Sequence, residues 1–185
     1  MLLHCAWTFG VHAYGDINNI TNDPLNDSLI EKLTNQESAI TSEDILSDQS
    51  FWSKEKRLNF LSKVSDILEL KQIKHALAIE NAMEDVFGLS WKSKLDPIIQ
   101  MKVDIDSKKR RPYDAESAKH LLRLIRNLSH HYNELAPNVK AALGPVDTLA
   151  DFWPSTFPLL LPRVYSAMLP FKADTNCARI HMFYC

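Results

Sequence analysis

Apolar residues recur three and four positions apart along most of the chain, and this period restricts the fold more than any other feature. In residues 53–68 the recurring positions are separated by Lys and Glu, which is the pattern of a helix with one buried face. These positions are Leu58, Phe60, Leu61, Val64, Ile67 and Leu68. A second helical stretch covers residues 73–87 and ends before Gly88, a typical C-terminal cap. Its inward positions are Ala78, Ile79, Ala82, Met83 and Val86. The sequence therefore predicts an all-α protein.

The first 52 residues differ in composition from the rest, being rich in Asn, Asp, Ser and Thr. One helix is expected over residues 27–33, and a second after Thr41, where T-S-E-D resembles a capping box. Both helices are short and carry few apolar positions. We therefore expect this segment to dock on the rest of the chain rather than to fold alone.

Four further helical elements are expected downstream. They open at Trp91, follow the cap formed by Asp96 and Pro97, lie between Pro137 and Gly144, and cover residues 157–169 as the last helix. Pro162 should kink that last helix or shift its start. Residues 103–105 give the single indication of a strand.

Glycine is scarce, with four in a chain of 185 residues, where average usage of about 7% would give roughly 13. Neither a G-x-G-x-x-G nor a G-x-x-x-x-G-K-[ST] motif can be assembled from these four. Dinucleotide binding and Walker-type nucleotide binding are therefore excluded by motif. No cofactor is expected.

Charge, cysteines and hydropathy limit the setting in which the chain works. The formal net charge is −2, so the chain as a whole does not indicate nucleic acid as its partner. Cys5, Cys177 and Cys185 are odd in number and lie near the two ends, which favours a reducing compartment without a disulfide framework or zinc site. The longest apolar stretch, residues 157–161, is too short to span a bilayer. We therefore expect a cytosolic or nuclear location and no contact with a membrane.

Basic residues concentrate in residues 108–134, although the whole chain is slightly acidic. This segment opens with four consecutive positive charges, Lys108, Lys109, Arg110 and Arg111. A helix that follows from a cap at Ser117, advancing about 100° per residue, has one polar and one apolar side. The polar side carries Lys119, Arg123, Arg126, Asn127 and His130, and the apolar side carries Ala118, Leu121, Leu122, Leu124, Ile125 and Leu128. A cationic side without an intervening carboxylate favours a polyanion as partner. For the basic run itself, a nuclear-localisation signal or a solvated loop is the alternative.

Beside this cationic side lies a set of groups suited to cleaving RNA without a metal. The set is Tyr113, Arg126, Asn127, His130, His131 and Tyr132. Cleavage needs a base for the 2′-hydroxyl, an acid for the departing 5′-oxygen and donors for the negative charge growing on phosphorus. Histidine can serve as the acid, arginine contacts phosphate at two points, and asparagine donates without charge. From the residues alone, a histidine pair that only caps a helix end stays an alternative.

A metal site is not expected in this segment. His130 and Glu134 are four positions apart and can share a helical face. However, the segment has no H-E-x-x-H motif, no cysteine and no second acidic cluster. The expected chemistry therefore needs no metal ion.

Residues 51–169 resemble the kinase-extension nuclease domain found in the inositol-requiring kinase and endoribonuclease, a stress sensor of the endoplasmic reticulum, and in the 2-5A-dependent ribonuclease L. The matching strings are F-W-S-K-E-K-R-L-N-F-L at 51–61, V-S-D-I-L-E at 64–69, L-L-R-L-I-R-N-L-S-H-H-Y-N-E-L-A-P at 121–137 and F-P-L-L-L-P-R-V-Y at 157–165, with the Tyr113 segment between them. The resemblance implies a compact helical ribonuclease domain over residues 51–170.

The resemblance also implies the catalytic residues, which are Tyr113, Arg126, Asn127 and His131. In the family the reaction is a metal-independent transesterification that leaves a 2′,3′-cyclic phosphate and a 5′-hydroxyl. By resemblance His131 is the general acid, Tyr113 the general base, and the other two stabilise the phosphate and the transition state. The spacing from Tyr113 to Arg126 and the H-H-Y-x-E-L string favour the stress-sensor branch over ribonuclease L. The residues expected to bind RNA are Lys108, Lys109, Arg110, Arg111, Lys119, Arg123 and His130.

Residues 1–50 resemble the tail of the kinase domain that precedes this nuclease in the family. The matching strings are G-V-H-A-Y-G-D at 10–16, D-S-L-I-E-K-L at 27–33 and T-S-E-D-I-L at 41–46. The nucleotide-binding loop, the β3 lysine, the H-R-D loop and the D-F-G site are absent, so no kinase activity is expected. Leu128 stands where the stress-sensor branch has a lysine, as in ribonuclease L, and residues 171–185 are left unassigned.

The sequence thus leads to rival hypotheses. The first is an endoribonuclease of the unfolded-protein-response type that cuts RNA in stem-loops or single-stranded loops. By resemblance it acts as a homodimer or as a dimer with full-length relatives, at the cytosolic face of the endoplasmic reticulum when attached to one. The second is a module that binds RNA or dimerises without cutting. A third is a truncated chain without a stable fold.

Overall fold

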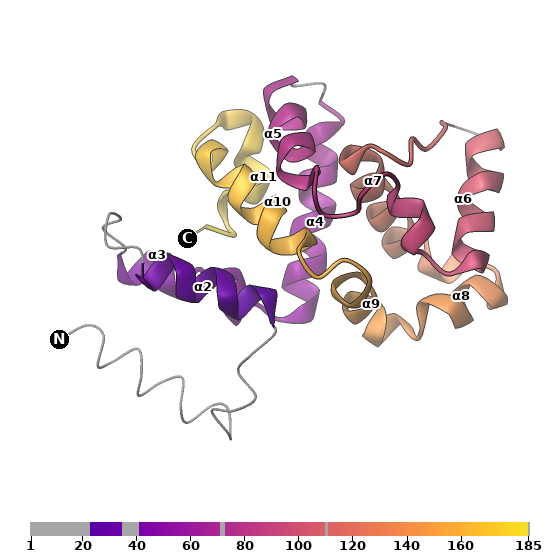
Figure 1. Ribbon diagram of the computed structural model, residues 1–185, viewed down its shortest axis with the longest axis horizontal. Helices are drawn as coiled ribbons and strands as arrows, with labels where there is room; N and C mark the ends of the chain where they lie inside the picture. The colour runs from indigo at the N-terminus through magenta and orange to yellow at the C-terminus, as the bar shows by residue number, and fades with distance from the viewer. Residues whose placement is uncertain (1–22, 35–40, 71–72, 110, 185) are drawn as a thin grey trace.

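The computed structural model describes residues 23–34, 41–70, 73–109 and 111–184 (Figure 1). Within these ranges every regular element is a helix and no strand occurs, so the predicted all-α fold class is confirmed. No helix in these ranges has both the length and the apolar character that a membrane span requires. Cys5, Arg110, Cys185 and the string at residues 10–16 lie outside the described ranges.

Long and short helices alternate along the chain. The α-helices are α2 (Pro24–Thr34), α3 (Ser42–Leu46), α4 (Lys54–Leu68), α5 (Ile73–Met83), α6 (Pro97–Lys109), α7 (Ala118–His130), α8 (Pro137–Leu143), α9 (Leu149–Thr156), α10 (Leu160–Met168) and α11 (Ala178–His181). The 3-10 helices are η2 (Gln49–Phe51), η3 (Trp91–Lys94), η4 (Tyr132–Glu134), η5 (Val146–Thr148), η6 (Leu169–Phe171) and η7 (Thr175–Cys177). In Figure 1 the long helix α4 runs through the middle, with α5, α10 and α11 on one side and α6, α7 and α8 on the other.

Helix α4 forms where the apolar period predicts it. Its N-cap is Ser53, whose Oγ accepts a hydrogen bond from the Lys56 N–H at 3.2 Å. The periodic positions Phe60, Leu61, Val64, Ile67 and Leu68 are buried. Helix α4 packs against α7, α9, α10 and α11, so its several buried faces join the two sides of the molecule into one core.

Two expectations fail in the middle of the chain. Helix α5 ends at Met83 rather than at residue 87, because the chain turns there and still buries Val86 and Phe87 outside the helix. Gly88 consequently lies in the following loop, with a φ of 65° that glycine tolerates. The strand indicated at residues 103–105 is wrong, because these residues belong to α6, where Ile99 and Val103 are buried one turn apart.

The C-terminal third departs from expectation in a similar way. Helix α9 was not predicted. Helix α10 begins at Leu160, so Pro162 lies in its first turn, where a missing N–H is tolerated, and the predicted shift of the start is confirmed. The expectation that residues 157–169 form the last helix is wrong, since η7 and α11 follow and bury Cys177, Ile180 and Phe183 in the core.

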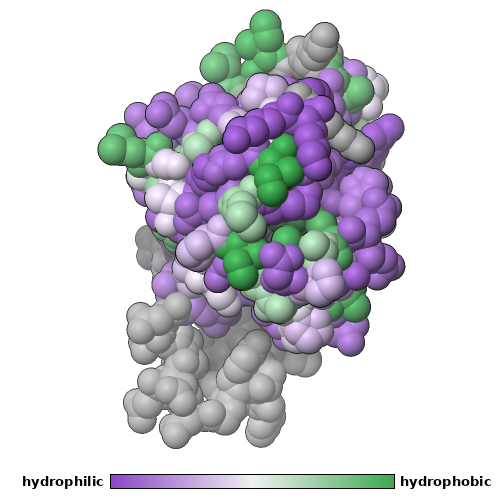
Figure 2. Space-filling view, turned by 90° about the vertical axis from the view of Figure 1, so that its right-hand side faces the viewer, coloured by the Kyte–Doolittle hydropathy of each residue, from purple (hydrophilic) through white to green (hydrophobic). Residues whose placement is uncertain are grey.

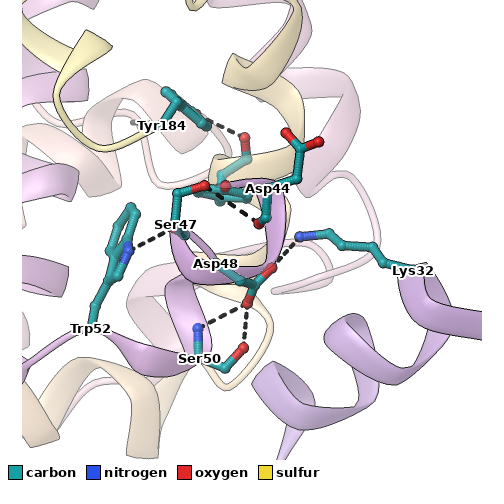
Figure 3. Close-up of polar contacts among 8 residues, drawn as sticks. Lys32, Asp44, Ser47, Asp48, Ser50, Trp52 and Tyr184 are labelled. Carbon is teal, nitrogen blue, oxygen red and sulfur yellow. Dashed lines mark hydrogen bonds and ion pairs between the residues drawn. The ribbon is translucent and has the colours of Figure 1, made fainter. Parts of the chain in front are cut away.

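The N-terminal segment docks on this core through a buried carboxylate. Asp48 is fully buried and forms an ion pair with Lys32 of α2 at 2.5 Å, while its other oxygen accepts from Ser50 N–H at 2.9 Å (Figure 3). Trp52 Nε1–H donates to the Ser47 carbonyl at 2.9 Å. Lys32 Nζ also lies 4.7 Å from the centre of the Tyr165 ring on α10, so α2, η2 and α10 share one contact region.

Helix α3 begins with the predicted capping box. The Thr41 Oγ1 accepts from the Asp44 N–H at 3.1 Å, and the Asp44 carboxylate accepts from the Thr41 N–H at 3.0 Å. These hydrogen bonds and the charge balance around Thr41 lower the pKa of Asp44, so the cap is intact at neutral pH.

Aromatic rings from both ends of the described chain meet on α4. The rings are Trp52, Phe60, Tyr165, Phe183 and Tyr184, with neighbouring centroids 4.8 to 6.1 Å apart. Most of these pairs meet edge to face or at a tilt, which is the favoured geometry for aromatic contacts. Phe60 touches four of the other rings and lies at the centre of this aromatic cluster.

Replacing Phe60 with alanine is expected to destabilise the whole domain. A Phe→Ala change at a fully buried site costs about 3–5 kcal/mol, which lowers the melting temperature of a chain this size by on the order of 10 °C. Phe51→Ala is the matched control, because Phe51 is exposed and its loss should shift the melting temperature by about 1 °C or less. Calorimetry of both variants decides the matter, and equal shifts would contradict the central position of Phe60.

Candidate functional site

Helix α7 carries most of the predicted site, and its start is fixed by a carboxylate from another helix. Ser117 is the N-cap, as predicted, but its hydroxyl donates to Glu80 Oε1 of α5 at 2.6 Å instead of capping the helix. The Ala118 and Lys119 N–H groups donate to the same carboxylate at 2.8 and 3.2 Å. Glu80 thus satisfies N–H groups that the first turn of a helix leaves free, and it places a negative charge at the positive end of the helix dipole.

Arg123 lies on the predicted polar side of α7 but is buried, with only 5% of its surface exposed. Its Nη2 donates to the Pro112 carbonyl at 2.5 Å, and its guanidinium lies 4.4 Å from the centre of the Tyr113 ring. This burial argues against the RNA contact expected for Arg123. Its place in the structure is beneath the loop that carries Tyr113, which it supports.

The loop before α7 is held at several points, so Tyr113 has a defined position. The Tyr113 N–H donates to Ser107 Oγ of α6 at 3.1 Å, and the Asp114 N–H donates to His120 Nδ1 of α7 at 2.8 Å. Trp91 of η3 lies edge-on to the Tyr113 ring and donates from Nε1 to the Ser117 carbonyl at 3.0 Å. Three helical elements therefore fix this loop.

Three of the four predicted catalytic residues come together around Asn127. Asn127 Nδ2 donates to Tyr113 Oη at 2.9 Å, and its backbone carbonyl accepts from the His131 N–H at 3.0 Å. His131 caps the end of α7, and its side chain is 57% exposed. Its Nδ1 lies 3.1 Å from Glu134 Oε1, which leaves the Nε2 edge of the ring for a ligand.

Arg126, the fourth predicted residue, faces a different neighbour. Its Nε forms an ion pair with Asp66 Oδ1 of α4 at 2.5 Å. Among the described residues, no hydrogen bond or ion pair joins Arg126 to Tyr113, Asn127 or His131. The four residues are therefore contiguous on one end of α7 and its preceding loop, but Arg126 takes its orientation from α4.

The other basic residues expected to bind RNA lie mostly at the surface. Lys108 and Lys109 are exposed in the last turn of α6, His130 is exposed at the end of α7, and Lys119 is partly buried. Arg111 is exposed and pairs with Glu69 of α4 at 2.6 Å. Partial burial alone would raise the pKa of Glu69, but the hydrogen bond and charge of Arg111 outweigh it and lower that pKa. Figure 2 shows the end of the molecule formed by α6 and α8, which is largely hydrophilic with small, separate apolar patches.

The expectation that no carboxylate intervenes on the cationic side needs correction. Helix α7 itself carries none there, but Asp66 and Glu69 of α4 and Glu80 of α5 reach it from outside. The period of one helix cannot reveal charges that neighbouring helices supply. The surface that stays cationic is consequently smaller than the sequence suggests and lies around Lys108, Lys109 and the end of α7.

The described residues were also compared with what a metal would need. Nowhere in residues 23–34, 41–70, 73–109 and 111–184 do three His, Cys, Asp or Glu side chains gather as a metal would require. The one acidic partner of the histidine pair is Glu134, which contacts His131 rather than His130. Cys177 is a free, buried thiol whose pKa is raised by burial.

The supporting residues Asp66, Glu80, His120 and Trp91 were not among the predicted site residues. Asp66 lies in the V-S-D-I-L-E string at 64–69, which marked the position but not its partner. Glu80 and Trp91 act through contacts 37 to 39 and 23 to 26 residues away, which no local pattern encodes.

The pH dependence of the Tyr113 loop should follow His120. Burial, reinforced by the nearby charge of Arg123, holds the pKa of His120 below its ordinary value of 6.5. The hydrogen bond from Asp114 N–H needs an unprotonated Nδ1. Because the folded pKa is lowered, this contribution to stability is present above pH 6.5 and is lost as the pH falls through the folded pKa. We expect faster hydrogen exchange at the Asp114 amide there, beyond its intrinsic pH dependence.

An NMR titration from pH 7.5 to 5 measures both the His120 ring and the Asp114 amide. His120→Gln is the control, since its side-chain oxygen accepts a hydrogen bond but does not titrate in this range. A His120 ring that titrates at or above 6.5 would overturn this account.

Comparison with known proteins gives consistent matches. The family model described as Ribonuclease 2-5A matches residues 57–180. The chain is 32% identical over 163 residues to the serine/threonine-protein kinase/endoribonuclease ire-1 of Caenorhabditis elegans, covering 85% of the chain and 16% of that protein. It is 32% identical over 130 residues to the sensor for unfolded proteins in the ER ire1 of Schizosaccharomyces pombe, covering 68% and 12%. It is also 32% identical over 195 residues to an inactive serine/threonine-protein kinase/endoribonuclease IRE1-like protein of Arabidopsis thaliana, covering 89% and 35%.

These matches cover most of the chain but only a part of each relative. The chain spans between 12% and 35% of the length of these three relatives. Residues 57–180 include α11 and much of the C-terminal segment left unassigned from the sequence. The chain therefore belongs to the Ribonuclease 2-5A family and carries the kinase-extension nuclease domain that it shares with the kinase/endoribonucleases.

Proposed function

We propose that this chain is a metal-independent endoribonuclease that cuts RNA by attack of a 2′-hydroxyl on the adjacent phosphate. The observation that carries the proposal is the 2.9 Å hydrogen bond from Asn127 Nδ2 to Tyr113 Oη. It brings the loop tyrosine to the end of α7, where His131 follows one turn later. The ire-1 relative is named an endoribonuclease, which supports the same activity.

In the proposed reaction the 2′-oxygen forms a bond to phosphorus and the bond from phosphorus to the 5′-oxygen breaks. Tyr113 takes the proton of the 2′-hydroxyl, and His131 gives a proton to the departing 5′-oxygen. The products are a 2′,3′-cyclic phosphate and a 5′-hydroxyl. Arg126 and Asn127 donate to the phosphate oxygens as negative charge grows in the transition state.

The substrate we propose is RNA in a stem-loop or a single-stranded loop. The exposed basic residues Lys108, Lys109 and Arg111 lie on the segment just before Tyr113, and His130 precedes His131. Such a cluster binds the phosphate backbone without reading sequence, while splayed loop bases are accessible where a duplex groove is not.

The proposal extends to assembly and setting. Residues 1–50 are the tail of a kinase domain, and the enzyme works as a homodimer or with full-length relatives. It processes or degrades mRNA in a response of the unfolded-protein type, at the cytosolic side of the endoplasmic reticulum. The name of the Schizosaccharomyces pombe relative, a sensor for unfolded proteins, supports that setting.

Truncating His131 should abolish cleavage without unfolding the protein. General acid–base catalysis contributes about 10²–10⁴-fold, so His131→Ala should lower kcat by that factor on a fluorescent stem-loop RNA in excess chelator. Asn138→Ala is the control, because Asn138 is an exposed polar residue in the first turn of α8. Mass spectrometry of the wild-type products should show the 2′,3′-cyclic phosphate.

The assay is run over a series of protein concentrations, because a dimeric enzyme loses specific activity on dilution. Equal cleavage by wild type and His131→Ala would exclude the proposed acid. The absence of cleavage at any concentration would exclude the activity itself.

A non-catalytic module is the second candidate, and one observation favours it. The Arabidopsis thaliana relative aligned over 89% of the chain is named inactive. In that case RNA binding would weaken as salt rises and on Arg126→Ala, while no cyclic phosphate appears.

A further inference from the structure

Asp66 connects α7 to the C-terminal helix α11 through two arginines. Its Oδ1 lies 2.5 Å from Arg126 Nε, and its Oδ2 lies 3.7 Å from Arg179 Nη1. The Asp66 side chain is 14% exposed, and the Arg126 and Arg179 side chains are 32% and 59% exposed. One carboxylate therefore lies between two cations, at the outer edge of the predicted active site.

We infer that Asp66 is a positioning residue for Arg126, and that Arg179 of α11 neutralises Asp66 so that its charge does not oppose the RNA phosphate. The inference rests on the proposed function, because it assigns how that site binds its substrate. Asp66 contacts Arg126 at Nε, and the Nε atom is buried. The two terminal nitrogens of the guanidinium carry four further N–H groups, which are the donors that suit a phosphate.

The ion pair also limits the freedom of the arginine side chain. A free arginine samples many rotamers, and ordering it at the moment of binding weakens affinity and misplaces donors. Asp66 lies on α4, whose packing against α7 is fixed by apolar residues, so the carboxylate is a rigid reference point. Arg126 is thereby oriented before RNA arrives.

Arg179 removes the drawback of a carboxylate beside a phosphate site. Without a second cation, Asp66 would repel the substrate almost as strongly as it orients Arg126. Arg179 comes from a segment that is firmly attached, because Cys177, Ile180 and Phe183 on either side of it are buried in the core. The three side chains together carry a net charge of +1.

A purely structural role would predict different behaviour. The interface between α4 and α7 is already made by fully buried apolar residues such as Val64, Ile67 and Ile125. Ion pairs as exposed as those of Arg126 and Arg179 add little to folding stability. The cluster is therefore better explained by its position next to Asn127 than by the fold.

The first experiment compares Asp66→Asn with Asp85→Asn. Asp85 is the matched control, because it pairs with Arg163 at 3.0 Å in an exposed pair and takes the same substitution. Rates are measured at protein concentrations where the wild-type rate no longer rises, so that dimer formation does not limit them. We expect kcat to fall roughly 10- to 100-fold for Asp66→Asn, to recover partly in Asp66→Glu, and to change less than about twofold for the control.

The double variant with Arg126→Ala separates positioning from stability. If Asp66 acts through Arg126, Asp66→Asn lowers kcat no further once Arg126 is absent. An additional fall of the same size in the Arg126→Ala background, or equal losses for Asp66→Asn and the control, would overturn the inference.

Arg179→Gln tests the second part. In the wild-type background it should lower kcat/KM several-fold, mainly by raising KM, because Asp66 is left uncompensated. In the Asp66→Asn background the same substitution should have no effect. An equal fall in both backgrounds would mean that Arg179 binds RNA directly, and would overturn its assigned role.

A binding measurement keeps this inference separate from the activity. A fully 2′-O-methylated stem-loop lacks the attacking hydroxyl and cannot be cut, so its Kd is measured by fluorescence anisotropy for the same set of variants. Non-additive losses for positions 66 and 126 support the positioning role even when the wild-type protein cuts no RNA. Additive losses exclude it, whatever the outcome of the cleavage assay.

Discussion

The structure of the site depends on the burial of one side of α7. Leu121, Leu122 and Ile125 are fully buried, and α7 packs along α4 and against α5. Because side-chain directions along a helix are fixed relative to one another, burying this side also sets where Arg126 and Asn127 lie. Glu80 determines where the helix begins and His131 marks where it ends, so the spacing of the site residues becomes a spacing in space.

Periodicity and capping predicted the parts of the fold that local rules control. Helix α4 follows its apolar period, Asp96 caps α6 by accepting from the Ile98 N–H, and Gly144 follows α8 with a φ of 82°. Helix ends that tertiary packing decides were missed. At residues 84–87 the chain leaves the helix, although its apolar pattern continues. The same two side chains, Val103 and Ile105, that indicate a strand also fit a helix with one buried and one exposed position.

The candidate site divides along the same line. Tyr113, Asn127 and His131 were identified from the resemblance, and the structure places them within reach of one another. The role of Arg123 could not be anticipated, because a cation on a polar helix side is ordinarily solvated. Here the 111–116 loop folds over it, and the Pro112 carbonyl and Tyr113 ring replace water. Likewise, a carboxylate such as Asp66 is exposed or paired according to what packs beside it, and its partners lie 60 and 113 residues further along the chain.

Stability and function meet on α4, which contributes to both at once. Phe60 centres the aromatic cluster that joins Trp52 to Phe183, and Asp66, less than two turns later, holds Arg126. The C-terminal segment follows the same logic, since Phe183 packs on the cluster while Arg179 reaches Asp66. A change that loosens the C-terminal segment therefore acts on the core and on the charge balance of the site together. This coupling gives the last residues of the domain a place in its chemistry, although no residue there touches Tyr113, Asn127 or His131 through a hydrogen bond or ion pair within the described ranges.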